Sequence, residues 1–454
     1  MRHRRLGPGI AGVVAWIALV GAGPTVPSPS FPAPALERTS KGIVIVSQST
    51  GGQLIAADIV VPAGLAQQSP GNAGVAGVTA ALVLRTKVDG GASLADAAAR
   101  VGATVSYTLD QNDTRFYLEA QPGQFGTLLH GLVDALSAPA TTELSTVRAA
   151  AIAAAQADAA SPAVAALGML RQIAYDGTGY AYPDSGRQLS LNKLSAADVA
   201  AFASSYRQGQ GTIVALEGAV DESVVAKVRT EFANFASASS ASNSSPLQPP
   251  STRGAGSHGS PIQNSVARGN EVVTHRAVSA PWVAVGYPAP NMYGADFPAM
   301  LVIEALLGRG GDVHSFALGS DSSLPDEFVG AYYQYEAQPG MLAIFLNGSD
   351  ANVDASVRDL QSAVNRLRGA VLPDAIVDHG RRLAIGQYFT GVSTLGDAAW
   401  MLGRSAASTD GPNFENLLPL RIAQVSSADV RRVAQRYLTG ESIGIVLPQT
   451  PTQR

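Results

Sequence analysis

The sequence predicts an α+β protein made of two similar α/β halves, each an antiparallel sheet covered by helices, with a linker between them. Three observations support this fold class: strand-like and helix-like segments are segregated instead of strictly alternating, the composition changes sharply once near mid-chain, and both halves end in a similar helix and strand. The chain has 454 residues, of which 46% are hydrophobic and 15% are charged. This length and balance allow two domains with buried cores.

Residues 1–35 have the features of a secretory signal. Three arginines among the first five residues precede an apolar run at 10–20. Ala33-Pro34-Ala35 provides an A-x-A-like cleavage site, and Gly21-Ala22-Gly23 provides an earlier one. The apolar run is too short for a membrane span and is interrupted by glycine. The alternative is that the same residues form an uncleaved N-terminal anchor. We therefore expect an exported protein, periplasmic or secreted, with no stable membrane span after cleavage.

Charge and cysteine content exclude several function classes. Removal of residues 1–35 would take away three arginines and no acidic residue, which changes the net charge from −4 to −7. Nucleic acids bind basic surfaces, so nucleic acid is not an expected partner. The chain has no cysteine, so disulfides, a cysteine-linked lipid anchor and thiolate metal sites are excluded.

A segment rich in serine, glycine and proline divides the chain. Residues 236–270 contain the Ser237–Ser245 stretch and the Pro249-Pro250 pair. Such a composition buries too little apolar surface to offset the entropy of ordering the chain. We therefore predict a flexible linker at 236–270 between an N-terminal domain, 39–235, and a C-terminal domain, 271–449.

The two domains end in similar sequence. Leu194–Tyr206 and Val425–Tyr437 share Ser, Ala, Asp, Val, Ala and Tyr at one constant offset, from Ser195 to Ser426. Each of these serines lies three residues before an aspartate, which predicts an N-cap at the start of a helix. An apolar strand is expected after each helix, at 212–216 and at 442–447. This common order predicts a duplicated half.

Apolar–polar alternation predicts the strands, and longer alanine-rich or apolar runs predict the helices. In the first half the expected strands are 42–47 and 54–61, joined as a hairpin at 49–52, and 104–109 and 114–120, joined at 110–113; the expected helices are 75–85, 93–101, 125–136, 142–159 and 163–174. In the second half the expected strands are 283–287, 329–336 and 341–347, the last two joined at 338–340, and the expected helices are 297–307, 353–366, 374–388 and 417–437.

Five short motifs follow one another in the first half. They are Ala63-Gly64 after a strand, Gly74-Val75-Ala76 opening a helix, Gly102-Ala103, Asp113-Thr114 and Tyr180-Ala181-Tyr182-Pro183 with Gly186 after it. Their order resembles the insulinase-like zinc metallopeptidases of family M16, the inverzincins or pitrilysin-type enzymes. The resemblance extends over residues 40–448 and implies two homologous halves arranged like a clamshell.

The resemblance also implies where a zinc site would lie. In active members the helix continues as H-x-x-E-H, whose two histidines bind zinc and whose glutamate takes a proton from zinc-bound water, and a later glutamate completes the site. Alignment on Gly74-Val75-Ala76 places Gly77, Ala80 and Ala81 at the ligand and base positions. The segment expected to supply the later glutamate, 149–155, contains alanine and one isoleucine. We therefore expect no catalytic residue, no metal ligand and no cofactor in this chain.

A relocated metal site is the remaining route to an active peptidase. No two of the six histidines are four or five residues apart, which argues against a zinc-binding pair on one helix. We expect His130 to be partly buried and hydrogen-bonded, and Asp378-His379 to lie on a solvated helix face. No role is assigned to His275 or His314. The remaining histidines are His3, in the signal, and His258, in the linker.

Other candidate groups have simpler interpretations. Active relatives hold the substrate backbone with an arginine and a tyrosine in the second half, but 321–330 has no arginine and Phe328 takes the tyrosine position. We interpret Tyr332, Tyr333 and Tyr335 as strand-packing residues. Two further stretches match no catalytic motif: 308–311 lacks the Lys-Ser/Thr of a phosphate-binding loop, and 184–186 lacks a G-x-S-x-G elbow and is expected to form a turn.

The resemblance and the substituted positions together predict a catalytically inactive M16 homologue. Its expected role is the non-catalytic subunit of a peptide-processing chamber formed with an active zinc peptidase, so that zinc is present only in the partner. A standalone exported peptide- or protein-binding protein without a protease partner is the alternative. Either a heterodimer or a homodimer would fit, and a pairing subunit should expose an apolar face.

Overall fold

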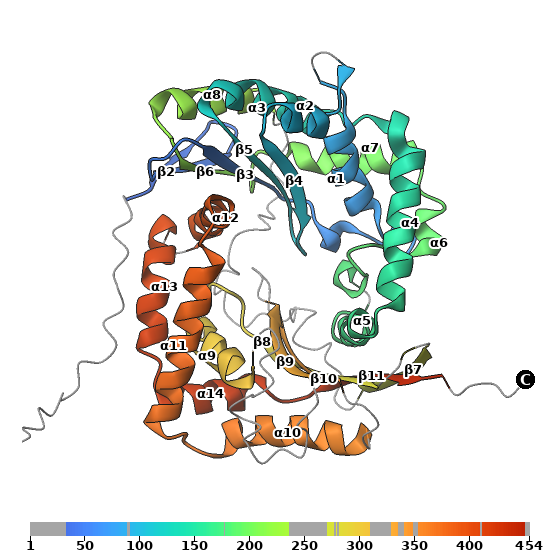
Figure 1. The fold of residues 1–454 in the computed structure, drawn as a ribbon, viewed down its shortest axis with the longest axis vertical. Helices are drawn as coiled ribbons and strands as arrows, with labels where there is room; N and C mark the ends of the chain where they lie inside the picture. The colour runs from blue at the N-terminus through green and yellow to red at the C-terminus, as the bar shows by residue number, and fades with distance from the viewer. Residues whose placement is uncertain are drawn as a thin grey trace, which may run out of the picture.

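The computed structural model describes residues 33–449 except 89–90, 177, 236–269, 277, 279–280, 309–327, 335–339, 348–352 and 409–410. It consists of two α/β halves, each with one mixed sheet that has helices on both faces (Figure 1). The predicted signal therefore lies outside the described residues except for 33–35. The predicted linker also lies outside them except for Asn270, which begins a strand.

The first half contains six strands and a larger set of helices. In chain order they are β1 Ala35–Arg38, β2 Val44–Ser49, β3 Ile55–Val61, η1 Leu65–Gln67, α1 Val75–Arg85, α2 Leu94–Arg100, β4 Thr104–Leu109, β5 Thr114–Ala120, α3 Pro122–Ser137, η3 Thr141–Glu143, α4 Leu144–Ala160, α5 Pro162–Ala174, η4 Gly179–Ala181, α6 Gln188–Leu191, α7 Ala196–Ser204, η5 Ser205–Arg207, β6 Ile213–Gly218 and α8 Glu222–Phe232.

The first sheet has the order β1-β2-β6-β3-β5-β4. The predicted hairpin between β4 and β5 is confirmed, with Leu109 paired to Thr114. The predicted hairpin at 49–52 is wrong, because β6 lies between β2 and β3. Strand β6 is parallel to β2 and antiparallel to β3, and the N–H of Thr50 donates to the carbonyl of Gly218. The connection at 49–54 therefore passes over the end of β6. Turn residues at 49–52 give no sign that a strand from much later in the chain lies between β2 and β3.

The second half repeats this plan with five strands. Its elements are β7 Asn270–Arg276, β8 Trp282–Ala289, α9 Phe297–Leu307, β9 Phe328–Gln334, β10 Gly340–Asn347, α10 Val353–Gly369, α11 Asp374–Gly391, α12 Leu395–Ala406, η6 Gly411–Asn413, α13 Phe414–Ala423, α14 Ser427–Tyr437 and β11 Ser442–Pro448. The sheet order is β7-β11-β8-β10-β9, and β7 is parallel to β11.

The duplicated ends predicted from the sequence form the same local structure. Ser195 and Ser426 cap α7 and α14 through capping boxes with Asp198 and Asp429. Each capped helix leads to a strand that pairs in parallel within its own sheet, β6 with β2 and β11 with β7. One predicted helix, 417–437, is in fact two helices. Because the capping box at Ser426 satisfies the first donors of a new helix, α13 ends at Ala423 and α14 begins at Ser427.

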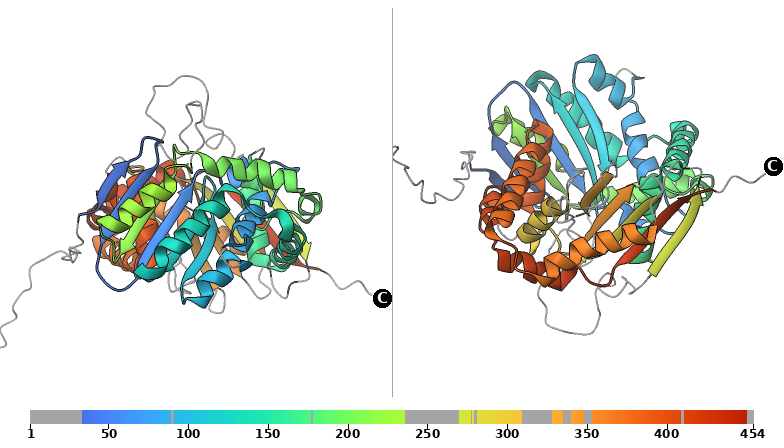
Figure 2. Two further views of the ribbon diagram at one scale, coloured as in Figure 1. Left: turned by 90° about the horizontal axis from the view of Figure 1, so that it is seen from above. Right: turned by 60° about the horizontal axis from the view of Figure 1, so that its bottom comes forward.

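Each sheet is covered on one face by helices of its own half and on the other face by one helix of the other half. On the first sheet, α1, α3, α7 and α8 pack on one face, while Leu402 and Ala406 of α12 pack against Val46, Val60 and Ile213 on the other. On the second sheet, α9, α10 and α14 cover one face, while α5 covers the other (Figures 1 and 2). The two halves therefore exchange helices.

The described helices include no single one that has both the length and the apolar character needed to cross a membrane; only α4 with its preceding turn and α5 meet that test, as a pair bent by 93°.

The exchanged helix α12 gives a direct test of this packing. Leu402 is fully buried between the halves, and Leu402→Ala should lower the free energy of unfolding by about 2–5 kcal/mol through lost apolar burial and a cavity. Leu189→Ala is the control, because Leu189 is 80% exposed and surface changes usually stay within about 0.5 kcal/mol. Urea unfolding followed by circular dichroism measures both variants. Equal stability of the two variants would contradict the packing.

Candidate functional site

The Ala63-Gly64 and Asp113-Thr114 motifs lie against each other at the end of β3. The hydroxyl of Thr114 donates to the carbonyl of Ala63 (2.5 Å), and the N–H of Leu65 donates to the carbonyl of Asp110 (3.1 Å). A Cβ at position 64 would lie 2.5 Å from that same Asp110 oxygen. Glycine is therefore required there by close approach of two backbone segments, and the motif fixes the β4–β5 turn beside α1.

The N-terminus of α1 is held by two segments distant in sequence. The side-chain carbonyl of Gln68 accepts hydrogen bonds from the N–H groups of Gly74 (2.7 Å) and Ala76 (3.3 Å), which satisfies two donors of the first turn. Gly74 has φ of 106°, and a Cβ on Gly186 would lie 2.5 Å from the Gly74 Cα atom. The structure therefore brings the helix-opening motif and the 180–186 motif into contact.

The 180–186 segment also makes polar contacts on both sides. Tyr180 donates from its hydroxyl to Oδ1 of Asn112 (2.6 Å), and Arg171 of α5 donates to the carbonyl of Tyr180 (3.2 Å) and forms an ion pair with Asp184 (2.9 Å). The segment thus connects the β4–β5 turn to α5, the helix that covers the second sheet.

Positions 77, 80 and 81 occupy the middle of this anchored helix. Gly77 and Ala81 lie one turn apart and are half-buried, whereas Ala80 is fully buried in the core. A Cβ on Gly77 would lie 3.3 Å from the side chain of Leu109 and 3.7 Å from the carbonyl oxygen of Asp184. The backbone needed to present two ligands on one face is therefore present, and the side chains there are hydrogen and methyl groups without a donor atom.

Helix α4 packs beside α1 and contributes only apolar contacts at this place. Ala151, Ile152 and Ala155 pack against the core of the first half, and Arg148 donates to the carbonyl of Leu194 (3.0 Å). The first acidic residue after Arg148 is Asp158. Within the described part of the chain, no group of three or more His, Asp or Glu side chains is placed to hold a metal ion.

The three described histidines, His130, His275 and His379, lie on elements other than α1. His130 is exposed, not partly buried as predicted, because α3 presents it to solvent; its ring is paired with Glu231 (2.8 Å) and lies 3.4 Å from Asp134. His379 on α11 is half-buried, and the adjacent Asp378 forms an ion pair with Arg381. His275 lies on β7. The other three, His3, His258 and His314, lie outside the described residues.

The tyrosines of β9 have different environments. Tyr333 is buried, its hydroxyl donates to the carbonyl of Pro290 and its N–H donates to the Glu304 carboxylate (2.9 Å), which confirms a packing role. Tyr332 points to the other face of the strand and is 49% exposed. Phe328 begins β9, whereas 321–327 and Tyr335 lie outside the described residues.

A buried ionic cluster joins the two halves at α12, and no sequence motif identified it. Asp58 of β3 is fully buried and pairs with Arg115 of β5 (3.0 Å). Arg404 of α12 is also buried and forms ion pairs with Asp113 (3.5 Å) and with Asp110 at the β4–β5 turn. Residues more than 280 positions apart are thus held together by charge.

Trp400 of α12 packs within the same cluster. The guanidinium groups of Arg115 and Arg404 lie 5.3 and 5.8 Å from its ring centre, in the range of cation–π attraction. Burial raises the pKa of Asp113 to about 7, against the attraction of Arg404, and burial likewise raises the pKa of Asp58, against the attraction of Arg115. These groups therefore meet at the contact between the halves, where burial opposes the charged form of both aspartates.

Two further buried acidic residues come one from each half. Glu217 of β6 and Glu415 of α13 are both buried. Burial raises the pKa of Glu217 to about 8, and the charge of Glu415 raises it further in the same direction; burial raises the pKa of Glu415 to about 7. In the folded chain both carboxyl groups therefore hold their protons to a much higher pH than exposed glutamates do.

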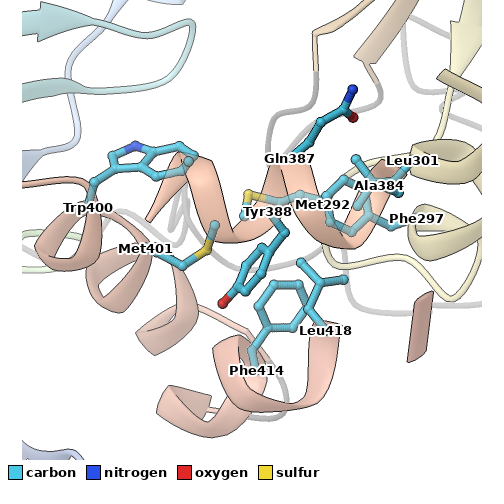
Figure 3. Close-up of a pocket in the computed structure, with 11 residues that line it drawn as sticks. Met292, Phe297, Leu301, Ala384, Gln387, Tyr388, Trp400, Met401, Phe414 and Leu418 are labelled. Atoms are coloured by element: carbon cyan, nitrogen blue, oxygen red, sulfur yellow. The ribbon is translucent and has the colours of Figure 1, made fainter. Parts of the chain in front are cut away.

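A small apolar cavity lies inside the second half, between α9, α11, α12 and α13 (Figure 3). Its volume is about 50 Å³, and Phe297, Tyr388, Trp400, Met401 and Phe414 contribute to its lining. Its lining is mostly aromatic and aliphatic, so the cavity is suited to a small apolar group. The Tyr388 hydroxyl donates to the carbonyl of Glu415 (2.9 Å), so the cavity belongs to the packing of this half.

Solved structures with the same arrangement include a protease from Helicobacter pylori, with a TM-score of 0.79 at 16% identity over 92% of this chain and all of that chain. A peptidase M16 inactive domain from Pseudomonas fluorescens has a TM-score of 0.77 at 15% identity, with 93% and 99% of the two chains covered. The chain has the two-domain M16 peptidase fold. An M16-like peptidase from Alicyclobacillus acidocaldarius matches this fold with a TM-score of 0.71 at 14% identity over 92% and 99% of the chains.

Comparison of sequences alone does not detect this similarity. No family model matches the chain, and no curated protein matches it. The M16 fold, which agrees with the predicted fold class and resemblance, is thus shown by the arrangement of elements over nearly the whole chain, at 14–16% sequence identity to these structures.

The buried acids of this M16 fold predict a pH-dependent stability. Asp113, Glu217 and Glu415 bind protons more tightly when folded, so their contribution is complete below about pH 4 and is lost as pH rises through about 7–8. The urea midpoint should therefore fall between pH 6 and pH 9, and Glu217→Gln should reduce that fall. Glu222→Gln, at a side chain that is 82% exposed, should leave it unchanged. A midpoint that rises over this range would contradict the assignment.

Proposed function

We propose that the chain is a catalytically inactive, exported M16-type protein that binds peptides, and that it forms a peptide-processing chamber as the non-catalytic partner of an active zinc peptidase. One observation carries this proposal: α1 keeps the anchored N-terminus and the one-turn spacing of positions 77 and 81, but those positions lack side-chain ligands. A peptide bound beside them would meet no group able to activate water.

The edge of the first sheet supports peptide binding without cleavage. Strand β4 ends the sheet order and pairs with β5 alone among the described strands. It packs beside α1, and its side chains alternate between exposed and half-buried. An extended peptide can add to such an edge through main-chain hydrogen bonds.

The pairing with an active subunit is supported by the fold of relatives. One structural neighbour is an inactive M16 domain and another is a protease, so both kinds of protein use this architecture. If no active peptidase accompanies this chain, the same binding surfaces would serve a standalone exported peptide-binding protein.

Zinc content tests the inactive assignment. The purified chain should contain far less than one zinc per chain by elemental analysis and should cleave no peptide. Gly77→His/Ala81→His creates a histidine pair at i and i+4, so zinc should raise the melting temperature of this variant only. Gly77→Asn/Ala81→Asn is the size-matched control. Stoichiometric zinc in the wild-type chain, or cleavage that a chelator abolishes, would refute the proposal.

Capture from the native host tests the partner. The tagged chain should co-purify with a second chain that contains zinc and H-x-x-E-H, and only the complex should cleave peptides in a chelator-sensitive way. Recovery of the chain alone, still able to bind peptides, would reject the pairing and support the standalone alternative.

A further inference from the structure

Strand β7 is the last strand at one end of the second sheet, as the described residues show it (Figures 1 and 2). It is seven residues long, pairs in parallel with β11, and has no second partner among the described strands. Val272 and Val273 at its centre are 39% and 44% exposed. Edge strands are usually protected by proline, by lysine or by being short, as the four-residue β1 is. Strand β7 has none of these protections.

The outward-facing backbone groups of β7 can be assigned. The N–H of Gln449, just after β11, donates to the carbonyl of Arg276 (2.8 Å), so Arg276 faces β11. In a strand paired in parallel, the N–H and C=O of one residue point to the same side, and the side alternates along the strand. Glu271, Val273 and His275 therefore direct their N–H and C=O groups away from β11.

The side chains of these three residues also share one face of the strand. Ile445, the β11 partner of Val273, packs in the core formed with α10 and α14, whereas Val446, the partner of Thr274, packs under α5. Alternation therefore places Glu271, Val273 and His275 on the face opposite α5, and all three are exposed. The residues whose backbone groups point away from β11 are therefore also the residues with exposed side chains on this face.

We propose that β7 pairs with β7 of a second copy of this chain, antiparallel and around a twofold axis at Val273. This register places all three outward-facing residues opposite outward-facing residues of the other copy, as antiparallel hydrogen-bonded pairs require. An axis at Val272 or at Thr274 would leave one of the three unmatched. The pairing joins two five-stranded sheets into one continuous sheet across an isologous interface.

Side-chain complementarity selects the same register. With the axis at Val273, each Glu271 lies directly opposite His275 of the other copy, and the two Val273 side chains meet between these pairs. A histidine ring N–H can donate to a carboxylate, and an apolar cross-strand pair stabilises a sheet, whereas like charges directly opposite destabilise it. The strand is therefore complementary to itself in both its side chains and its backbone hydrogen bonds.

This surface is separate from the helix that carries the proposed inactive site, so the inference does not depend on a peptidase partner. Strand β7 belongs to the second sheet, whereas α1 and β4 belong to the first half. A complex with a peptidase could be lost while the β7 dimer persists, and the reverse could also occur.

Light scattering coupled to size-exclusion chromatography of the full chain tests whether it forms this dimer. The wild-type chain should be a dimer, and Val273→Pro should be a monomer with an unchanged circular dichroism spectrum, because proline removes an outward N–H and leaves the β11 ladder intact. His275→Glu, which places carboxylates opposite each other, should weaken dimerisation about tenfold, and Glu271→His/His275→Glu should restore it. Val371→Glu, at an exposed position elsewhere, should leave the dimer unchanged.

Three results would overturn the inference. They are a monomeric wild-type chain at the highest soluble concentration, a dimer that His275→Glu does not weaken, and a double swap that fails to restore the loss caused by His275→Glu. Because the double swap keeps both residue types, it separates pairing across the interface from a local effect on folding.

Discussion

The fold depends on the exchange of one helix between the halves. A sheet with two apolar faces needs cover on both, and each half supplies enough helices for only one face of its own sheet. Helix α12 of the second half covers the first sheet, and α5 of the first half covers the second. Arg404, buried against Asp110 and Asp113, fixes the position of α12 by charge, and Leu402 fixes it by apolar contact. Neither half could therefore bury its sheet alone.

This exchange also determines what surrounds α1. The 180–186 segment leads from α5 to the N-terminus of α1, so the helix that covers the second sheet and the helix with the substituted positions are linked through Arg171 and Tyr180. Gln68 and Gly186 hold the first turn of α1 although positions 77 and 81 carry no ligand. Because these contacts also support the packing of the first half, they hold the helix in place independently of any ligand at positions 77 and 81.

Local sequence patterns predicted most of the helices and strands, but they did not predict how strands distant in sequence pair. The hairpin at β4–β5, the helix at Val75–Arg85 and both serine caps follow from residues close in sequence. The order of β2, β6 and β3 does not, because β6 lies more than 150 residues after β3. Helix α12 was missed since its buried face carries glycine, arginine and serine beside apolar residues. Motif order assigned positions 77, 80 and 81 to a zinc motif, which stays a prediction, whereas the ionic cluster gave no sequence signal because its members lie far apart in the chain.

In the proposed function, α1 takes the position of a metal-binding helix but carries no side-chain ligand at positions 77 and 81. The most direct measurement is a crystal structure of the chain grown with zinc, with anomalous diffraction recorded at the zinc absorption edge. The account predicts no anomalous peak between α1 and α4. A strong peak beside Gly77 and Ala81, with protein ligands at bonding distance, would contradict it.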